Sequence, residues 1–144
     1  MRRLGLYILA GATFWRPIYS DATKGTLRIM KINDFSFGCI KIDNKEYDHD
    51  VVIDRGSIGK RHKKPSKEFK QFGHTPLSVK EDIPWNCRRL IVGTGAYGRL
   101  PVMDEVVTEA ARRNVELVCV PTSEAIPKMN EGDPETNAIL HVTC

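Results

Sequence analysis

Residues 89–120 decide the fold, and they read RLIVGTGAYGRLPVMDEVVTEAARRNVELVCV. The stretch opens with a short apolar strand pattern and closes, at 115–120, with a near-continuous apolar run of the kind found in buried parallel strands. Between them, residues 103–114 have the apolar spacing of a helix, with acidic residues in the first turn and arginines in the last, as the helix dipole favours. Because strand, helix and strand follow in direct succession, the stretch predicts two parallel strands joined by a helix that covers the sheet.

The same alternation continues along the chain, where residues 122–129 predict a second helix and residues 138–143 a last strand. In the other direction, a capping-box spacing at 78–81 predicts one helical turn. Residues 35–42 alternate between apolar and smaller or polar positions, a turn signal follows, and residues 47–53 are interpreted as a second strand, which predicts an antiparallel hairpin. We therefore expect a single α/β domain whose mixed sheet combines an N-terminal antiparallel hairpin with a C-terminal β-α-β-α-β parallel unit.

The composition is that of an ordinary globular domain, with 144 residues, 41% hydrophobic and 28% charged, and a net charge of +4. These values exclude a collagen, a coiled coil, an extensively disordered chain and a membrane bundle. The four cysteines form no C-x-x-C pair, and two lie inside apolar runs, which favours free thiols in a reducing, cytoplasmic compartment. No spacing of His, Cys, Asp or Glu matches a metal site, so we expect neither a metal nor a cofactor.

Residues 1–29 need a separate interpretation. Arg2 and Arg3 precede an apolar stretch that ends near a small-residue triplet, which has the outline of a secretory signal peptide. The stretch is too short to cross a bilayer. The interpretation that we favour is a tail or an upstream extension before Met30, so that residues 30–144 form the folded domain.

Residues 54–76 are rich in Gly, Pro and basic residues and lack periodicity, which predicts a long loop. Within it, residues 55–70 hold seven Lys or Arg and one Glu, whereas the chain outside this loop and the N-terminal segment is acidic. That balance disfavours a nucleic-acid binder and favours an acidic protein partner, with a phosphorylated ligand or a weak RNA contact as alternatives. The candidate partner-binding residues are Lys60, Arg61, Lys63 and Lys64.

The sequence GTGAYG at 93–98 matches the G-x-G-x-x-G pattern of dinucleotide-binding turns and follows a predicted strand. No helix opens at the third glycine, and too few residues follow for a second nucleotide-binding half, so a tight turn or a small anion nest fits better. Loops at the carboxyl ends of neighbouring parallel strands meet at one edge of the sheet, where open α/β sheets bind ligands. The candidate ligand-binding residues are Gly93, Thr94, Gly95, Thr122, Ser123 and His74, the last as an acid or base.

The sequence closes with His141, Thr143 and Cys144, which raises the question of a catalytic Cys–His pair. On a strand, His141 and Thr143 share one face and Cys144 continues the opposite face, so such a pair needs the strand to twist or end. A carboxylate at Cys144 would also disfavour the thiolate. We therefore expect structural roles for His141 and Cys144, with a nearby cation as the condition for the opposite outcome.

Six motifs, in order, resemble those of one family: FSFGCI (35–40), the strand that begins at Tyr47, GHTPLS (73–78), IVGTG (91–95), PTSEA (121–125) and LHVTC (140–144). The chain resembles the small α/β domain of unknown function that is shared by archaeal and bacterial hypothetical proteins, the adipogenesis-associated protein of animals and a mitochondrial complex I assembly factor. The resemblance covers about residues 32–144. It implies a compact domain with a mixed sheet and no settled activity, and its assembly-factor members imply work as a partner or adaptor.

Two function hypotheses follow from these observations. The leading one is a non-catalytic interaction or assembly protein that uses the basic loop and has room for a small anion site. The alternative is a small-molecule-binding protein or enzyme, with its pocket at the strand ends between the loops at 93–95 and 121–123. The sequence decides neither whether the protein is an enzyme nor its oligomeric state.

Overall fold

The computed structural model describes residues 30–70 and 73–144, so the interpretation of residues 1–29 as a tail or a signal lies outside the described residues. The elements are, in chain order, β2 (Ile32–Ser36), β3 (Cys39–Ile42), β4 (Lys45–Tyr47), β5 (Val51–Asp54), β6 (Ser57–Lys60), the 3-10 helix η1 (Lys64–Phe69), β7 (Arg89–Thr94), α1 (Asp104–Arg112), β8 (Glu116–Val120), α2 (Thr122–Met129) and β9 (Thr136–His141). Among the residues described, no helix is long and apolar enough to cross a membrane.

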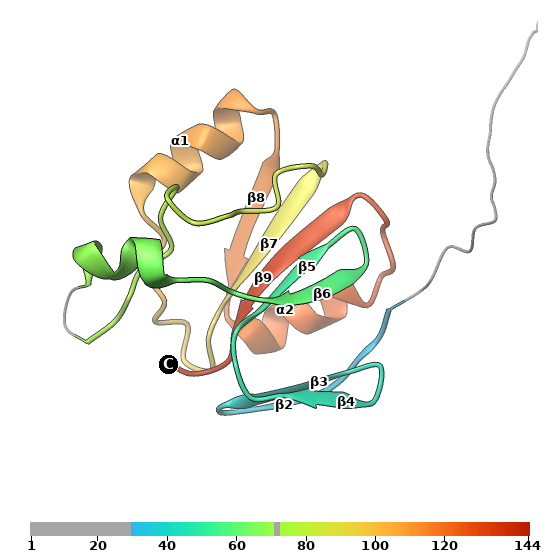
Figure 1. Ribbon diagram of the computed structural model, residues 1–144. Helices are drawn as coiled ribbons and strands as arrows, with labels where there is room; N and C mark the ends of the chain where they lie inside the picture. Colours follow the sequence, from blue (N-terminus) through green and yellow to red (C-terminus); the bar gives the residue numbers. More distant parts are fainter. Residues whose placement is uncertain (1–29, 71–72) are drawn as a thin grey trace, which may run out of the picture.

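A five-stranded mixed sheet forms the centre of the molecule, with its strands in the order β6-β5-β9-β7-β8 (Figure 1). β7 pairs in parallel with both β8 and β9, whereas β5 runs antiparallel to β9 and to β6. The predicted β-α-β-α-β unit is therefore confirmed as β7, α1, β8, α2 and β9. One detail differs from the prediction, because β8 is an edge strand whose Glu116 and Cys119 are exposed.

The N-terminal strands form a separate antiparallel sheet of β2, β3 and β4 rather than the two long strands that the alternation predicts. Gly38 adopts a φ of +85°, which lets the chain turn back between β2 and β3 in the middle of the expected first strand. The expected second strand, 47–53, is divided between β4 and β5, which belong to different sheets. The mixed α/β class is confirmed, and the antiparallel strands of the main sheet are the β5–β6 hairpin.

Apolar side chains cover both faces of the main sheet. On one face, residues of α2 and of the small sheet pack against Ile91 and Leu140. On the other face, residues of α1 and of the segment before β7 pack against Leu90, Val92 and Ile139.

Residues 54–76 are not the structureless loop that their composition predicts. β6 pairs with β5 as a hairpin, and η1 follows it. A single hydrogen-bonded turn forms at 78–81, as predicted, because the N–H of Glu81 donates to the carbonyl oxygen of Ser78 and the N–H of Lys80 donates to Oγ of Ser78, but no helix follows it. The side chain of Glu81 does not cap a helix but enters the interior, because it binds Arg61 there.

Candidate functional site

The two loops predicted to bind an anion lie side by side at the carboxyl ends of the parallel strands. The N–H of Gly95 donates to Oγ1 of Thr122 at 2.9 Å, and the N–H of Thr122 donates to the carbonyl oxygen of Gly95 at 3.0 Å. Oγ1 of Thr122 in turn donates to the carbonyl oxygen of His141 at 2.6 Å. Because Thr122 is completely buried, its hydroxyl is used within the fold and is not exposed to a ligand.

The other predicted ligand-binding residues of these loops occupy different positions. Gly93 packs directly against Thr122, where a Cβ would come within 2.9 Å of Oγ1. Thr94 is buried at the end of β7 beside His141 of β9, and Ser123 is exposed in the first turn of α2. Two hollows of about 210 and 400 Å³ lie elsewhere, the first over the β5–β6 hairpin and the second beside α1.

The amides of the loop after β7 bind the residues that follow β9. Three N–H groups of residues 96–99 donate to the carbonyl oxygens of Thr143 and Cys144 at 2.9 to 3.3 Å. Gly95 has a φ of +106°, and a Cβ at this position would lie 2.2 Å from the Thr143 oxygen, so only glycine allows the two segments to approach. The amides of the predicted anion nest are thus occupied by the chain itself, and an anion would have to displace these carbonyl oxygens.

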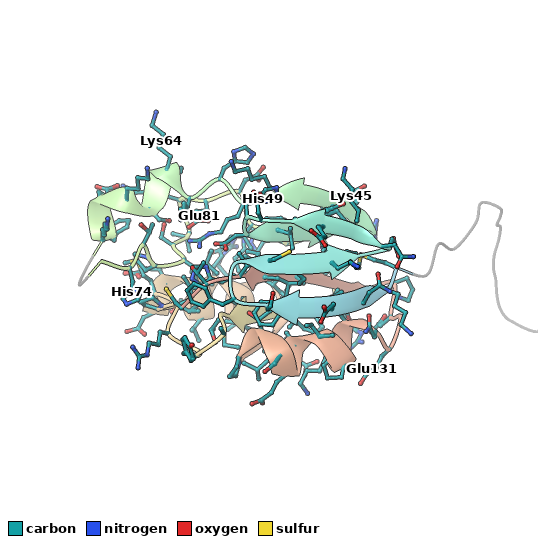
Figure 2. All side chains as sticks on the ribbon, turned by 90° about the horizontal axis from the view of Figure 1, so that it is seen from below. Lys45, His49, Lys64, His74, Glu81 and Glu131 are labelled. Atoms are coloured by element: carbon teal, nitrogen blue, oxygen red, sulfur yellow. The ribbon has the colours of Figure 1, made fainter. Side chains whose placement is uncertain are left out.

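The thiol of Cys144 lies beside the imidazole of His74, with Sγ 3.2 Å from Nδ1. His74 belongs to the segment after η1, and Figure 2 shows it on the same side of the molecule as that helix. Both residues are half-buried. We expected His74 to act as an acid or base at the strand ends, but the sequence did not predict this partner, because we compared Cys144 only with His141.

His141 is held by other groups. Its Nδ1 lies 2.8 Å from Oδ2 of Asp50, and its Nε2 lies 3.2 Å from Oγ1 of Thr143. The second carboxylate oxygen of Asp50 accepts the N–H of Val142 at 3.0 Å. Asp50 immediately precedes β5, so its carboxylate fixes the end of β9 against β5, and this contact agrees with the structural role expected for His141.

The surroundings of Asp50 keep its carboxylate charged in the folded protein. Burial by itself would raise the pKa of this carboxyl group. The hydrogen bond and charge of His141, the N–H of Val142 and the guanidinium of Arg61 outweigh burial and lower the pKa to about 2.

Arg61 is buried, which corrects its assignment as a surface residue that binds a partner. Its side chain is 1% exposed and lies between two carboxylates. Nη1 donates to Asp50 at 3.0 Å, while Nε and Nη2 donate to the two oxygens of Glu81 at 2.8 and 2.7 Å. Nη2 also donates to the carbonyl oxygen of Pro76 at 3.1 Å. A buried charge is tolerated only with such pairing, so Arg61 acts as an internal cross-link.

Ser66 attaches η1 to the same cross-link. Its hydroxyl donates to Oε2 of Glu81 at 2.5 Å and lies 2.7 Å from Oγ of Ser78. Ser66 is completely buried, although the residues on either side of it are exposed. The backbone of the basic segment, residues 57–69, is therefore held in place by β6 pairing and by Ser66, unlike that of a long unstructured loop.

Lys60, Lys63 and Lys64 lie on the surface of this segment together with Lys67, and we call these four residues the lysine surface. All four are exposed, and Figure 2 shows Lys64 pointing away from the body of the molecule. Within residues 30–70 and 73–144, no ion pair involves any of the four. In the same part of the chain, no group of three or more His, Cys, Asp or Glu residues could hold a metal ion.

Comparisons with known proteins identify the fold in several solved structures. The conserved hypothetical protein PH1505 from Pyrococcus horikoshii OT3 is 38% identical, with a TM-score of 0.69, and the match covers 79% of this chain and 99% of that one. The protein MT938 is 25% identical, with a TM-score of 0.60, over 80% of this chain and 99% of that one. No protein-family model and no curated protein matches the chain.

A third structure supplies a name for the domain. A protein from Bordetella pertussis, solved by solution NMR and described as a Mth938-like domain, is 15% identical over 87% of this chain and 92% of its own length, with a TM-score of 0.54, and it shows a shared fold. The match to PH1505 spans nearly all of that protein at an identity that shows common membership, which confirms the resemblance found in the sequence. The chain therefore belongs to the Mth938-like domain family of conserved hypothetical proteins.

Proposed function

We propose that this domain is a non-catalytic interaction or assembly protein, and that its lysine surface binds an acidic segment of a partner protein. The observation that carries the proposal is that the lysine side chains are exposed while the backbone beneath them is ordered. Four exposed lysines, with no ion pair among the described residues, stand on a segment whose backbone is held by β6 pairing and by Ser66.

Order in this segment matters for affinity, because a binding surface that is already fixed loses less conformational entropy when a partner docks. Lysines at fixed positions also present a defined pattern of charge, which steers association and selects partners of complementary charge. Surface charges are screened over about 10 Å at 0.1 M salt, so an interaction that depends on them weakens as salt rises.

The small-anion part of the hypothesis receives less support. The amides of residues 96–99 already bind the carbonyl oxygens of Thr143 and Cys144, and Thr122 is buried in bonds of its own. The proposal therefore rests on the lysine surface and not on the loops at the strand ends.

The test is co-purification of the full chain with its partners at low and at high salt. One variant replaces the lysine surface with glutamine (Lys60, Lys63, Lys64 and Lys67), and a matched control replaces four lysines outside it (Lys31, Lys41, Lys45 and Lys128), so that both variants have the same net charge. We expect the native chain and the control to retain a protein at low salt and the first variant to lose it.

Binding to a synthetic poly-glutamate peptide, followed by fluorescence anisotropy, gives the same comparison with a defined probe. Equal binding by the two variants would show that only net charge matters and would refute the assignment of the lysine surface. Failure of the native chain to retain any protein at low salt would refute the interaction function itself.

A further inference from the structure

We propose that Cys144 and His74 form a thiol-exchange site that reacts with small organic disulfides. The pair is separate from the lysine surface, so the inference goes beyond the proposed function. Sγ of Cys144 lies 3.2 Å from Nδ1 of His74, within the reach at which an imidazole can take a proton from a nucleophile. Both residues are half-buried, so neither is enclosed in the interior.

His74 is available as a base. In the part of the chain that the structure describes, Cys144 is the only hydrogen-bond partner of its side chain. The ring of His141, by contrast, is engaged at both nitrogens, by Asp50 and by Thr143. The imidazole beside the thiol is thus the one that can accept a proton without breaking a structural contact.

The backbone holds the sulfur in place. The carbonyl oxygen of Cys144 accepts the N–H groups of Tyr97 and Arg99 at 2.9 and 3.3 Å, so the backbone of this residue is fixed against the loop after β7. Oγ1 of Thr143 lies 3.8 Å from Sγ and donates toward it. A positioned nucleophile, a base and a donor to the developing charge are the elements of an activated thiol.

The exchange balances without any further reagent. As Sγ of Cys144 attacks one sulfur of a small disulfide R–S–S–R, its proton passes to Nδ1 of His74. The new bond is Sγ–S–R, and the S–S bond of the reagent breaks. The leaving R–S⁻ takes the proton from the imidazolium and departs as R–S–H, so Cys144 is oxidised to a mixed disulfide and one half of the reagent is reduced.

The other cysteines provide controls within the same molecule. Burial of the sulfur raises the pKa of the Cys119 thiol and of the Cys87 thiol, which lowers their thiolate content. Neither has an imidazole partner among the residues described, yet Cys119 is an exposed residue. Exposure of the residue thus favours reaction at Cys119 and its raised thiol pKa opposes it, so the effect of His74→Gln on the Cys144 rate decides whether the imidazole activates Cys144.

The experiment treats the full chain at pH 7 with a limiting amount of oxidised glutathione, quenches with acid at intervals and locates the mixed disulfides by peptide mapping in a mass spectrometer. We expect Cys144 to react at least about tenfold faster than Cys119, because a positioned base contributes at least this much. His74→Gln should remove most of the advantage, while His62→Gln, at an exposed histidine of the basic segment, should leave it unchanged.

Two results would overturn the proposal. One is a Cys144 rate no greater than that of Cys119 in the unsubstituted chain, a comparison that does not depend on any variant folding. The other is a Cys144 rate that survives His74→Gln in a variant whose circular dichroism spectrum matches that of the native chain.

Discussion

Replacing Arg61 with methionine should destabilise the domain more than any other single change to its charged residues. Methionine fills part of the space of the arginine stem but removes the guanidinium between Asp50 and Glu81. Those two carboxylates are 10% and 3% exposed, so Glu81 would remain in the interior with no cation beside it and Asp50 would keep only the imidazole of His141. Removing one member of a buried ion pair costs about 3–5 kcal/mol, because the remaining charge is left uncompensated.

A loss of this size is a large part of the roughly 5–15 kcal/mol that stabilises a typical domain. For a domain of about this length, 1 kcal/mol corresponds to roughly 4 °C, so Tm should fall by about 12–20 °C. The deficit should narrow as the pH is lowered, since carboxyl groups left without Arg61 bind protons more readily in the folded chain than in the unfolded one.

Urea unfolding followed by circular dichroism measures the loss. The matched control is Lys80→Met, which breaks the ion pair between Lys80 and Glu68, whose side chains are 53% and 56% exposed. Exposed pairs contribute at most about 1 kcal/mol, so this control should change little. A loss below about 1 kcal/mol for Arg61→Met, or equal losses in the two variants, would refute the role of Arg61 as an internal cross-link.

Two further substitutions test the end of β9. Because the folded pKa of Asp50 is about 2, below the usual value of 3.8, its carboxylate stabilises the fold above about pH 4 and this contribution, about 2 kcal/mol, is lost as the pH falls toward 2. Asp50→Asn should flatten the urea-derived stability curve in that window, and a curve parallel to the native one would contradict the assignment. Gly95→Ala should cost about 3 kcal/mol or more, since a Cβ would lie 2.2 Å from the Thr143 oxygen at a φ of +106°. Gly56→Ala, at a φ of +84° with open space around it, should cost only about 1 kcal/mol, and equal shifts in thermal melts would count against the close approach.

The parallel half of the fold could be predicted from the sequence because each of its elements has a local signature. The helix expected at 122–129 is α2 (Thr122–Met129), and the helix expected at 103–114 contains α1 (Asp104–Arg112). The apolar runs that flank them are β7 and β8, which pair in parallel. Burial of a strand or of one helix face leaves a pattern within the segment itself, so a single sequence is enough to detect it.

The N-terminal half could be predicted only in part, because alternation records which side of a strand is buried and not where the chain reverses. Phe35, Phe37 and Cys39 keep a period of two across the turn at Gly38, so the turn left no break in the pattern. In 47–53, the polar residues Asp48, His49 and Asp50 separate β4 from β5, and the prediction of one strand across them was wrong.

The contacts of Arg61 and of Cys144 were harder still to predict, because the residues that take part in them are far apart in the chain. Arg61 stands in a basic run that is typical of a solvated surface, and its burial depends on carboxylates 11 and 20 residues away. Cys144 and His74 are 70 residues apart. Pairings between single side chains at such separations produce no periodicity, so only the folded chain brings them together.

The position of β9 has a consequence for how the protein is made in the cell. β9 follows every other strand that the structure describes, yet it lies between β5 and β7 in the main sheet. Until the ribosome has synthesised β9, the edges of β5 and β7 that pair with it remain unpaired. Such edges recruit strands from other chains, and pairing between distant segments forms slowly. Chains stalled before residue 136 should therefore aggregate or occupy chaperones, and the nascent domain should reach its native state in one late step, after β9 has left the ribosome.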